Sequence, residues 1–84
     1  MTVSADTIRA TLLSLVAQRG PDKTICPSEV ARALSAQAWQ DLMPAVREAG
    51  IALAAEGCIA VTQKGRVVNP QSAKGPIRYR QAKD

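Results

Sequence analysis

The sequence has no histidine and no phenylalanine, and only two cysteines, Cys26 and Cys58. Without histidine, the chain cannot form a Ser-His or Cys-His pair for nucleophilic catalysis. Two cysteines alone cannot supply the three or four ligands of a zinc site. A glycine-rich phosphate-binding loop is also missing. We therefore predict no catalytic residues, no metal site and no cofactor, and we expect that the protein is not an enzyme.

Long apolar runs are missing as well. No stretch approaches the ~18 consecutive apolar residues of a membrane span, and the N-terminus lacks the basic patch and apolar run of a signal peptide. Two cysteines are too few for a disulfide scaffold in so short a chain. These features predict a cytoplasmic protein with no membrane partner. A redox pair between Cys26 and Cys58 stays open if neighbouring strands carry them.

Aromatic residues are scarce too, since Trp39 and Tyr79 are the only two. The chain has 84 residues, of which 46% are apolar, and this suits one domain spanning residues 1–84. Aliphatic side chains must build its interior, and we expect Trp39 to be the largest member of that core. If Trp39 is instead exposed beside Met43, it marks an apolar contact patch.

Two helices are predicted in the first half of the chain. Apolar residues recur at helical spacing over residues 5–19. Ser4 is a suitable N-cap, and Gly20 follows as a stop signal. A second helix of two turns fits residues 27–34.

A third helix is predicted over residues 41–56. Pro44 decides where it begins, because a proline inside a helix costs about 3 kcal/mol. With Asp41 as the cap, Pro44 falls in the first turn, where its missing N–H costs nothing. Gly57 ends this helix.

The last third of the chain changes to a period of two, which is typical of strands. It predicts a hairpin over about residues 58–68, turning at Lys64-Gly65, and a further strand over about residues 77–80. A very short strand at residues 23–26 is expected to pair with the hairpin. Residues 81–84 are expected to be frayed.

This order of elements is that of a winged helix-turn-helix, an α+β fold. It has three helices and a small three-stranded antiparallel sheet, and the hairpin is its wing. Pairing of the strand near Ile25 with the hairpin would bring Cys26 and Cys58 to neighbouring strands.

Four blocks of sequence carry a family resemblance, and they occur in the expected order. They are Cys26-Pro27-Ser28-Glu29-Val30-Ala31, Trp39 with Leu42-Met43-Pro44 and Val46-Arg47, Ile59-Ala60-Val61-Thr62-Gln63-Lys64-Gly65, and Lys74-Gly75-Pro76-Ile77-Arg78. From the first helix to Arg80, the chain resembles domain-of-unknown-function family 3253, a small bacterial family. The resemblance implies a winged-helix fold, and it transfers no activity to this chain because none is assigned to the family. Gly50 departs from the alanine usual on that helix face.

Positive charge is concentrated at the end of the chain. From Met1 to Gly57, five Lys and Arg residues face six Asp and Glu residues, a net charge of −1. From Cys58 to Asp84, six basic residues face one acidic residue, a net charge of +5. A neutral helical body with a basic ribbon is typical of a module that binds a polyanion.

The predicted partner is DNA, contacted through its phosphate backbone. The main candidate residues are Lys64, Arg66, Lys74, Arg78 and Arg80. Weaker, groove-facing candidates are Arg47, Gln40 and Gln37. The polar face of the third helix is nearly neutral, which favours weak sequence preference over reading of base edges.

Two other interpretations stay open. Basic residues at strand edges can simply prevent aggregation between sheets. The domain could also be a protein–protein docking or dimerisation module that binds no nucleic acid. Pairing of Arg78 and Arg80 with Glu29 and Glu48 would remove most of the proposed cationic surface.

Overall fold

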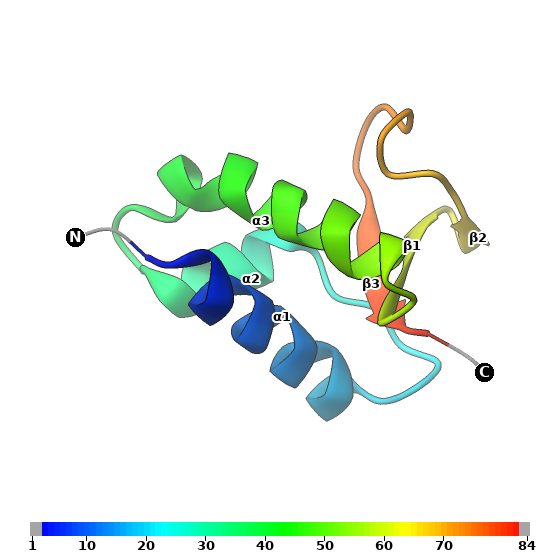
Figure 1. Ribbon diagram of the computed structural model, residues 1–84, viewed down its shortest axis with the longest axis horizontal. Coiled ribbons are helices and arrows are strands. Elements are labelled where there is room, and N and C mark those ends of the chain that lie inside the picture. Colours follow the sequence, from blue (N-terminus) through cyan, green and yellow to red (C-terminus); the bar gives the residue numbers. More distant parts are fainter. Residues whose placement is uncertain (1–2, 83–84) are drawn as a thin grey trace.

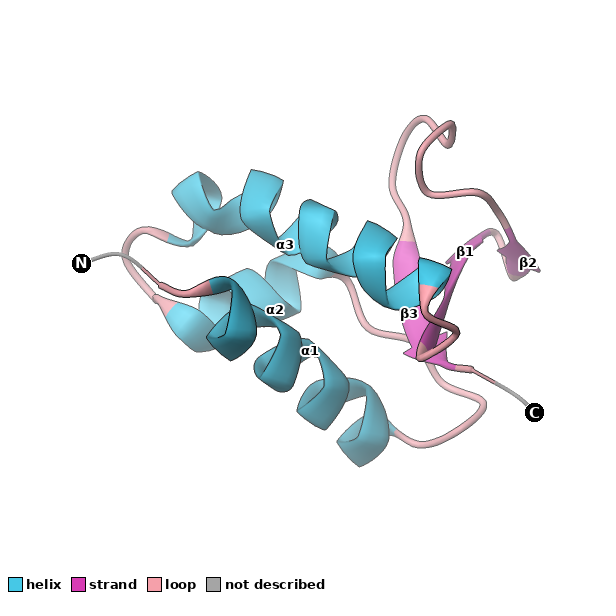
Figure 2. Ribbon diagram, in the orientation of Figure 1, coloured by secondary structure: helices cyan, strands magenta, loops and turns pink. Residues whose placement is uncertain are grey.

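The structure is a computed structural model that describes residues 3–82. In chain order its elements are α1 (Ala5–Arg19), α2 (Pro27–Leu34), α3 (Trp39–Ala55), β1 (Ile59–Gln63), β2 (Arg66–Val67) and β3 (Arg78–Gln81). The three helices pack together at one end of the molecule, and the strands lie at the other, beside the C-terminal half of α3 (Figure 1). Figure 2 shows the same separation of helices from strands. The predicted α+β fold, with three helices and a three-stranded antiparallel sheet, is confirmed.

Helix α1 has the predicted bounds and the predicted cap. The Ser4 hydroxyl accepts a hydrogen bond from the Thr7 amide at 3.1 Å. Its buried face consists of Ile8, Leu12 and Val16, one residue in each successive turn. This helix therefore follows directly from the local sequence.

Helix α3 begins earlier than the sequence predicts. Its first residue is Trp39, and Ala38 is the N-cap. The prediction that Asp41 caps the helix is wrong, because Asp41 lies within the first turn. Pro44 is then inside the helix and gives up one backbone hydrogen bond. Tertiary packing offsets this loss, since Trp39 packs against the core and the Arg32 guanidinium lies 4.3 Å from its ring centre.

Trp39 is only partly buried, so the expectation that it is the largest core residue is wrong. That place belongs to Tyr79, whose side chain is fully buried between the sheet and α3. Gly50 of α3 makes the fit possible. A Cβ atom at this position would lie 2.5 Å from the Tyr79 Oη and 2.7 Å from its Cζ. Glycine at position 50 therefore has a packing reason, because the ring occupies the space that an alanine methyl would need.

The sheet has the strand order β2-β1-β3, and both pairings are antiparallel. The hairpin turns as predicted at Lys64 and Gly65, whose φ angles are 50° and 82°. Gln81 belongs to β3 and pairs with Ile59, so the expected fraying at this residue is wrong. Lys83 and Asp84, the end of the segment expected to be frayed, lie outside the described residues.

The short strand expected at residues 23–26 is reduced to one bridge, between Ile25 and Tyr79. Ile25 pairs with β3 and not with the hairpin. Its amide donates to the Tyr79 carbonyl, and the Tyr79 amide donates to the Ile25 carbonyl, both at 2.8 Å. Strand β3 therefore separates Ile25 from β1, and Cys26 and Cys58 are not on neighbouring strands. Both thiols are free. No helix within residues 3–82 combines the length and apolar character needed to cross a membrane.

Candidate nucleic-acid interface

The segment that joins β1 to β3, residues 64–77, includes the turn and second strand of the predicted wing hairpin, and from here on "the wing" means these residues. It contains β2 and a loop that rises beside α3 (Figure 1). Gln63, the last residue of β1, holds this loop in place. Its Nε2 donates hydrogen bonds to the Lys74 carbonyl at 2.5 Å and the Pro76 carbonyl at 3.2 Å. The sequence does not predict this role, because a glutamine before a turn gives no signal of which distant carbonyls it will bond.

Three predicted cations gather around this anchor. Lys64 follows Gln63 directly in the chain, and Arg66 is the cross-strand partner of Gln63. The Lys74 carbonyl accepts a hydrogen bond from the Gln63 side chain. All three side chains are exposed. Within residues 3–82 none of them forms an ion pair or a side-chain hydrogen bond. Their charge is therefore available to a partner.

Two arginines of α1 are instead paired with glutamates of the helical body. Arg9 binds Glu56 through two hydrogen bonds of 2.8 Å, and this guanidinium lowers the pKa of the Glu56 carboxyl. Arg19 pairs with Glu29. Partial burial opposes ionisation of Glu29, but the Cys26 amide and the Arg19 guanidinium outweigh it, and the pKa of Glu29 is lowered.

The two arginines of β3 lie apart from the wing cations. Arg78 and Arg80 flank the buried Tyr79, so they share one face of the strand, as predicted. The cross-strand pair of Gln63 and Arg66 lies on the same face as Tyr79. Arg66 therefore lies on the opposite face of the sheet from Arg78 and Arg80. The structure divides the five predicted cations into two groups.

Arg78 is also engaged in structural contacts. Its Nε donates to the Thr24 hydroxyl at 2.5 Å, and its two terminal nitrogens contact the Cys26 sulfur at 3.0 Å and the Thr24 carbonyl at 3.3 Å. These contacts tie β3 to the segment before α2. Glu29, one of the two acidic partners considered for Arg78 and Arg80, pairs with Arg19 instead.

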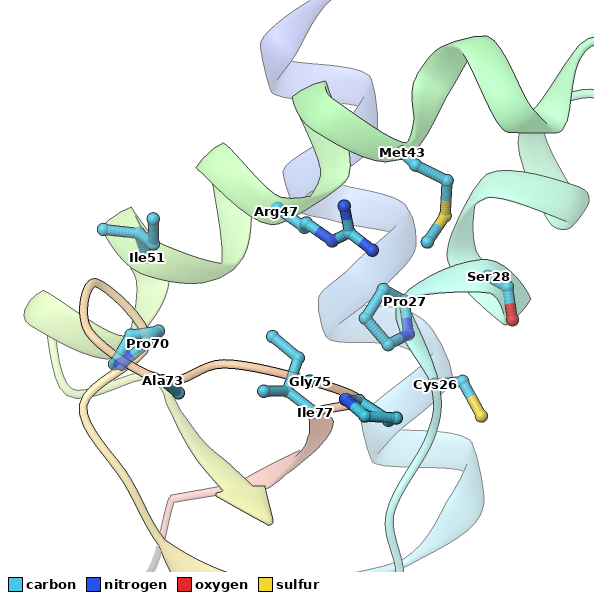
Figure 3. A pocket seen from close by; sticks show the side chains of 11 residues that line it. Cys26, Pro27, Ser28, Met43, Arg47, Ile51, Pro70, Ala73, Gly75 and Ile77 are labelled. Atoms are coloured by element: carbon cyan, nitrogen blue, oxygen red, sulfur yellow. The ribbon is translucent and has the colours of Figure 1, made fainter.

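The weaker candidates follow α3. Arg47 is exposed, and its guanidinium reaches into a cavity of about 630 Å³ between α3, the start of α2 and the wing (Figure 3). Gln40 lies two turns earlier on the same side of the helix. Gln37 is in the α2–α3 connection, at the end of the molecule away from the wing (Figure 1). Arg47 is thus the candidate on α3 that the structure places nearest to the wing.

A family model described as a protein of unknown function (DUF3253) matches residues 5–82. The chain belongs to this family. No curated protein matches it. The DUF3253 description names no activity, so the chemistry of the site must be argued from the residues.

In this DUF3253 protein, the described residues contain no group of three or more His, Cys, Asp or Glu side chains that could hold a metal ion. The wing instead carries the ammonium groups of Lys64 and Lys74 and the guanidinium of Arg66, on a segment anchored by Gln63. Such groups bind phosphate oxygens through charge-assisted hydrogen bonds.

Proposed function

We propose that this protein binds DNA through the phosphate backbone, with Lys64, Arg66 and Lys74 of the wing as the main contacts. The observation that supports this function is the contrast in charge use. Both ion pairs of the described residues employ cations of α1, whereas the three wing cations have no acidic partner there. Binding to a phosphate backbone would release the counterions condensed on it.

Arg47 and Gln40 are secondary contacts in this proposal. Arg47 lines the cavity beside the wing (Figure 3), and Gln40 lies two helical turns earlier on the same side of α3. The exposed part of α3 also carries Asp41 and Glu48, which repel phosphates. Arg78 and Arg80 add positive potential from the other face of the sheet. This mixture favours weak sequence preference.

A bacterial source and a cytoplasmic location are further parts of the proposal. The resemblance stated above supports the first. The two free thiols are consistent with the second, because cytosolic thiols stay reduced.

A fluorescence anisotropy titration with a mixed-sequence duplex, repeated at several salt concentrations, tests this function. If three to four phosphates are contacted, the log–log slope of affinity against salt should be about −2.7 to −3.6. The double variant Lys64→Glu/Arg66→Glu should abolish binding at moderate salt.

A matched control compares Lys64→Glu with Lys23→Glu, which makes the same charge change in the exposed turn after α1. Binding should fall at least tenfold for the first and change little for the second. Equal losses would mean that net charge alone attracts DNA. No binding of the unmodified protein at low salt would exclude the function.

A docking or dimerisation module is the second candidate. Val67 on the edge strand β2 is 63% exposed, and within residues 3–82 it is the large hydrophobic side chain that the fold leaves in solvent. An apolar residue on an open strand edge favours pairing with another chain. Sedimentation of the unmodified protein and of Val67→Lys, over a range of concentrations, would show whether this edge associates.

A further inference from the structure

The cavity beside Arg47 has a composition that phosphate binding does not require. Its volume of about 630 Å³ lies within the range of small-molecule sites in proteins. Most of its lining is apolar, with Met43 and Ile51 from α3, Pro27 from α2, and Pro70, Ala73 and Ile77 from the wing. Three separate elements thus line one largely apolar space that is open to solvent on one side.

The lining is also asymmetric. Arg47 extends from α3 toward Pro27, whereas Ile51, Pro70 and Ala73 are grouped at the other end (Figure 3). Among the described residues, Arg47 is the only charged side chain of the lining, and it forms no ion pair or hydrogen bond there. The cavity therefore has one cationic region and one apolar end.

A ligand that covers Arg47 must bring negative charge, because a guanidinium removed from water without a partner is strongly unfavourable. One cation balances one negative charge, which a carboxylate supplies. A phosphate monoester carries about 1.5 to 2 negative charges at neutral pH. A guanidinium can also hold both carboxylate oxygens through two parallel hydrogen bonds. The apolar end then requires a hydrocarbon body.

We propose that this cavity binds a small aliphatic monocarboxylate, with its carboxylate on Arg47 and its chain against Ile51, Pro70 and Ala73. The site uses none of the three main wing cations, although it shares Arg47, a secondary contact, with the proposed DNA binding. Because Arg47 lies on the same side of the molecule as the wing, an occupied cavity would neutralise a secondary DNA contact.

Octanoate is a suitable probe, with methyl and amide NMR of the full chain as the readout. Titration should shift the methyl signals of Met43, Ile51 and Ala73 in a saturable manner. Octanol has the same chain without the charge, and acetate has the charge without the chain. Both should bind at least tenfold more weakly than octanoate.

Two variants locate the ligand. Arg47→Gln should weaken octanoate binding about tenfold, and Ala73→Phe should block the apolar end while leaving Arg47 in place. Lys23→Gln is the control for loss of a surface cation and should have no effect. An amide spectrum with the dispersion of the unmodified protein would show that each variant is folded.

The proposal is overturned if octanol binds as tightly as octanoate, if acetate binds as tightly as octanoate, or if neither Arg47→Gln nor Ala73→Phe changes the octanoate affinity. Inorganic phosphate that displaces octanoate more effectively than acetate does would instead assign Arg47 to phosphate binding. Lys64→Glu/Arg66→Glu should lose DNA and keep octanoate, so failure of either proposal can be distinguished from failure of the other.

Discussion

The body and the wing of this protein use their side chains in opposite ways. The body is formed by the three helices, the bridge residue Ile25, β1 and β3. It contains the buried hydrophobic core and both ion pairs found among residues 3–82. The wing, residues 64–77, contributes no fully buried hydrophobic residue, and its cations are unpaired within the described residues. Hydrogen bonds from the Gln63 side chain hold the wing, and the Val68 amide donates a further hydrogen bond to the Val61 carbonyl. The three wing cations therefore have no acidic neighbour within the described residues and stay accessible to a partner.

The largest expected effect compares one apolar residue from each region. Tyr79→Ala should reduce the free energy of unfolding by about 3–5 kcal/mol, because it empties the centre of the core. Val67→Ala in the wing should change it by less than about 0.5 kcal/mol, since the side chain is mostly exposed. Urea denaturation followed by circular dichroism measures both. A similar loss for the two variants would contradict the division into body and wing.

A smaller effect tests the contact between α3 and the sheet. Alanine is a better helix former than glycine by about 1 kcal/mol, so Gly50→Ala would stabilise an isolated helix. Here the new methyl overlaps the Tyr79 ring, and we expect a net loss of about 1–3 kcal/mol in the same denaturation experiment. Ala52→Gly, at an exposed position of α3, is the matched helix-propensity control. A more stable Gly50→Ala protein would show that the ring moves freely.

The alkaline limb of the stability curve depends on the same tyrosine. Burial raises the pKa of Tyr79 to about 12, although the charge of Arg47 acts in the opposite direction. The folded state therefore holds this proton more tightly than the unfolded chain, whose tyrosine has a pKa near 10. The stabilisation is complete below pH 10 and is lost as the pH rises toward 12, at about 1.4 kcal/mol per pH unit.

Tyr79→Phe is the comparison for this loss of stability at alkaline pH, because the phenylalanine side chain cannot ionise. It also removes a buried hydroxyl that has no hydrogen-bond partner among the described residues, so the variant should be at least as stable as the unmodified protein at neutral pH. Its unfolding free energy should fall less steeply between pH 10 and pH 12. Parallel curves for the two proteins would show that Tyr79 is not the titrating group.

Local signals in the sequence predicted the parts of the fold that depend on local chemistry. Ser4 and Gly20 define α1, and Lys64-Gly65 defines the hairpin turn, because caps and turns are decided by neighbouring residues. The start of α3 was predicted too late, since the packing of Trp39 is a tertiary effect that outweighs the cost of Pro44.

Non-local contacts account for what the sequence could not predict. The charge split identified the wing cations, but strand register decides that Arg66 and Arg78 lie on opposite faces. The bonds from Arg78 to Thr24 and Cys26 span more than fifty residues. The approach of Tyr79 to Gly50 and the cavity around Arg47, which is lined by three segments distant in the sequence, are also non-local.

A further small effect on stability concerns the anchor between the two regions. Gln63→Ala removes the hydrogen bonds to the carbonyls of Lys74 and Pro76, both at exposed positions. We expect a loss of less than about 1 kcal/mol in unfolding free energy. Hydrogen exchange of the Ser72 and Ala73 amides, which bond to the Asn69 carbonyl, should accelerate if the loop is released.

Gln18→Ala is the matched control, because it removes an exposed glutamine bond to Ser14 within the body. It should leave the exchange of the wing amides unchanged. Gln63→Ala should also weaken DNA binding about threefold, because the loop would then lose conformational entropy when DNA binds and this cost lowers the affinity. Unchanged exchange at Ser72 and Ala73 would mean that the backbone bond from Val68 to Val61 holds the wing without help from Gln63. In that case, the cations of the wing would keep their positions whichever side chain occupies residue 63.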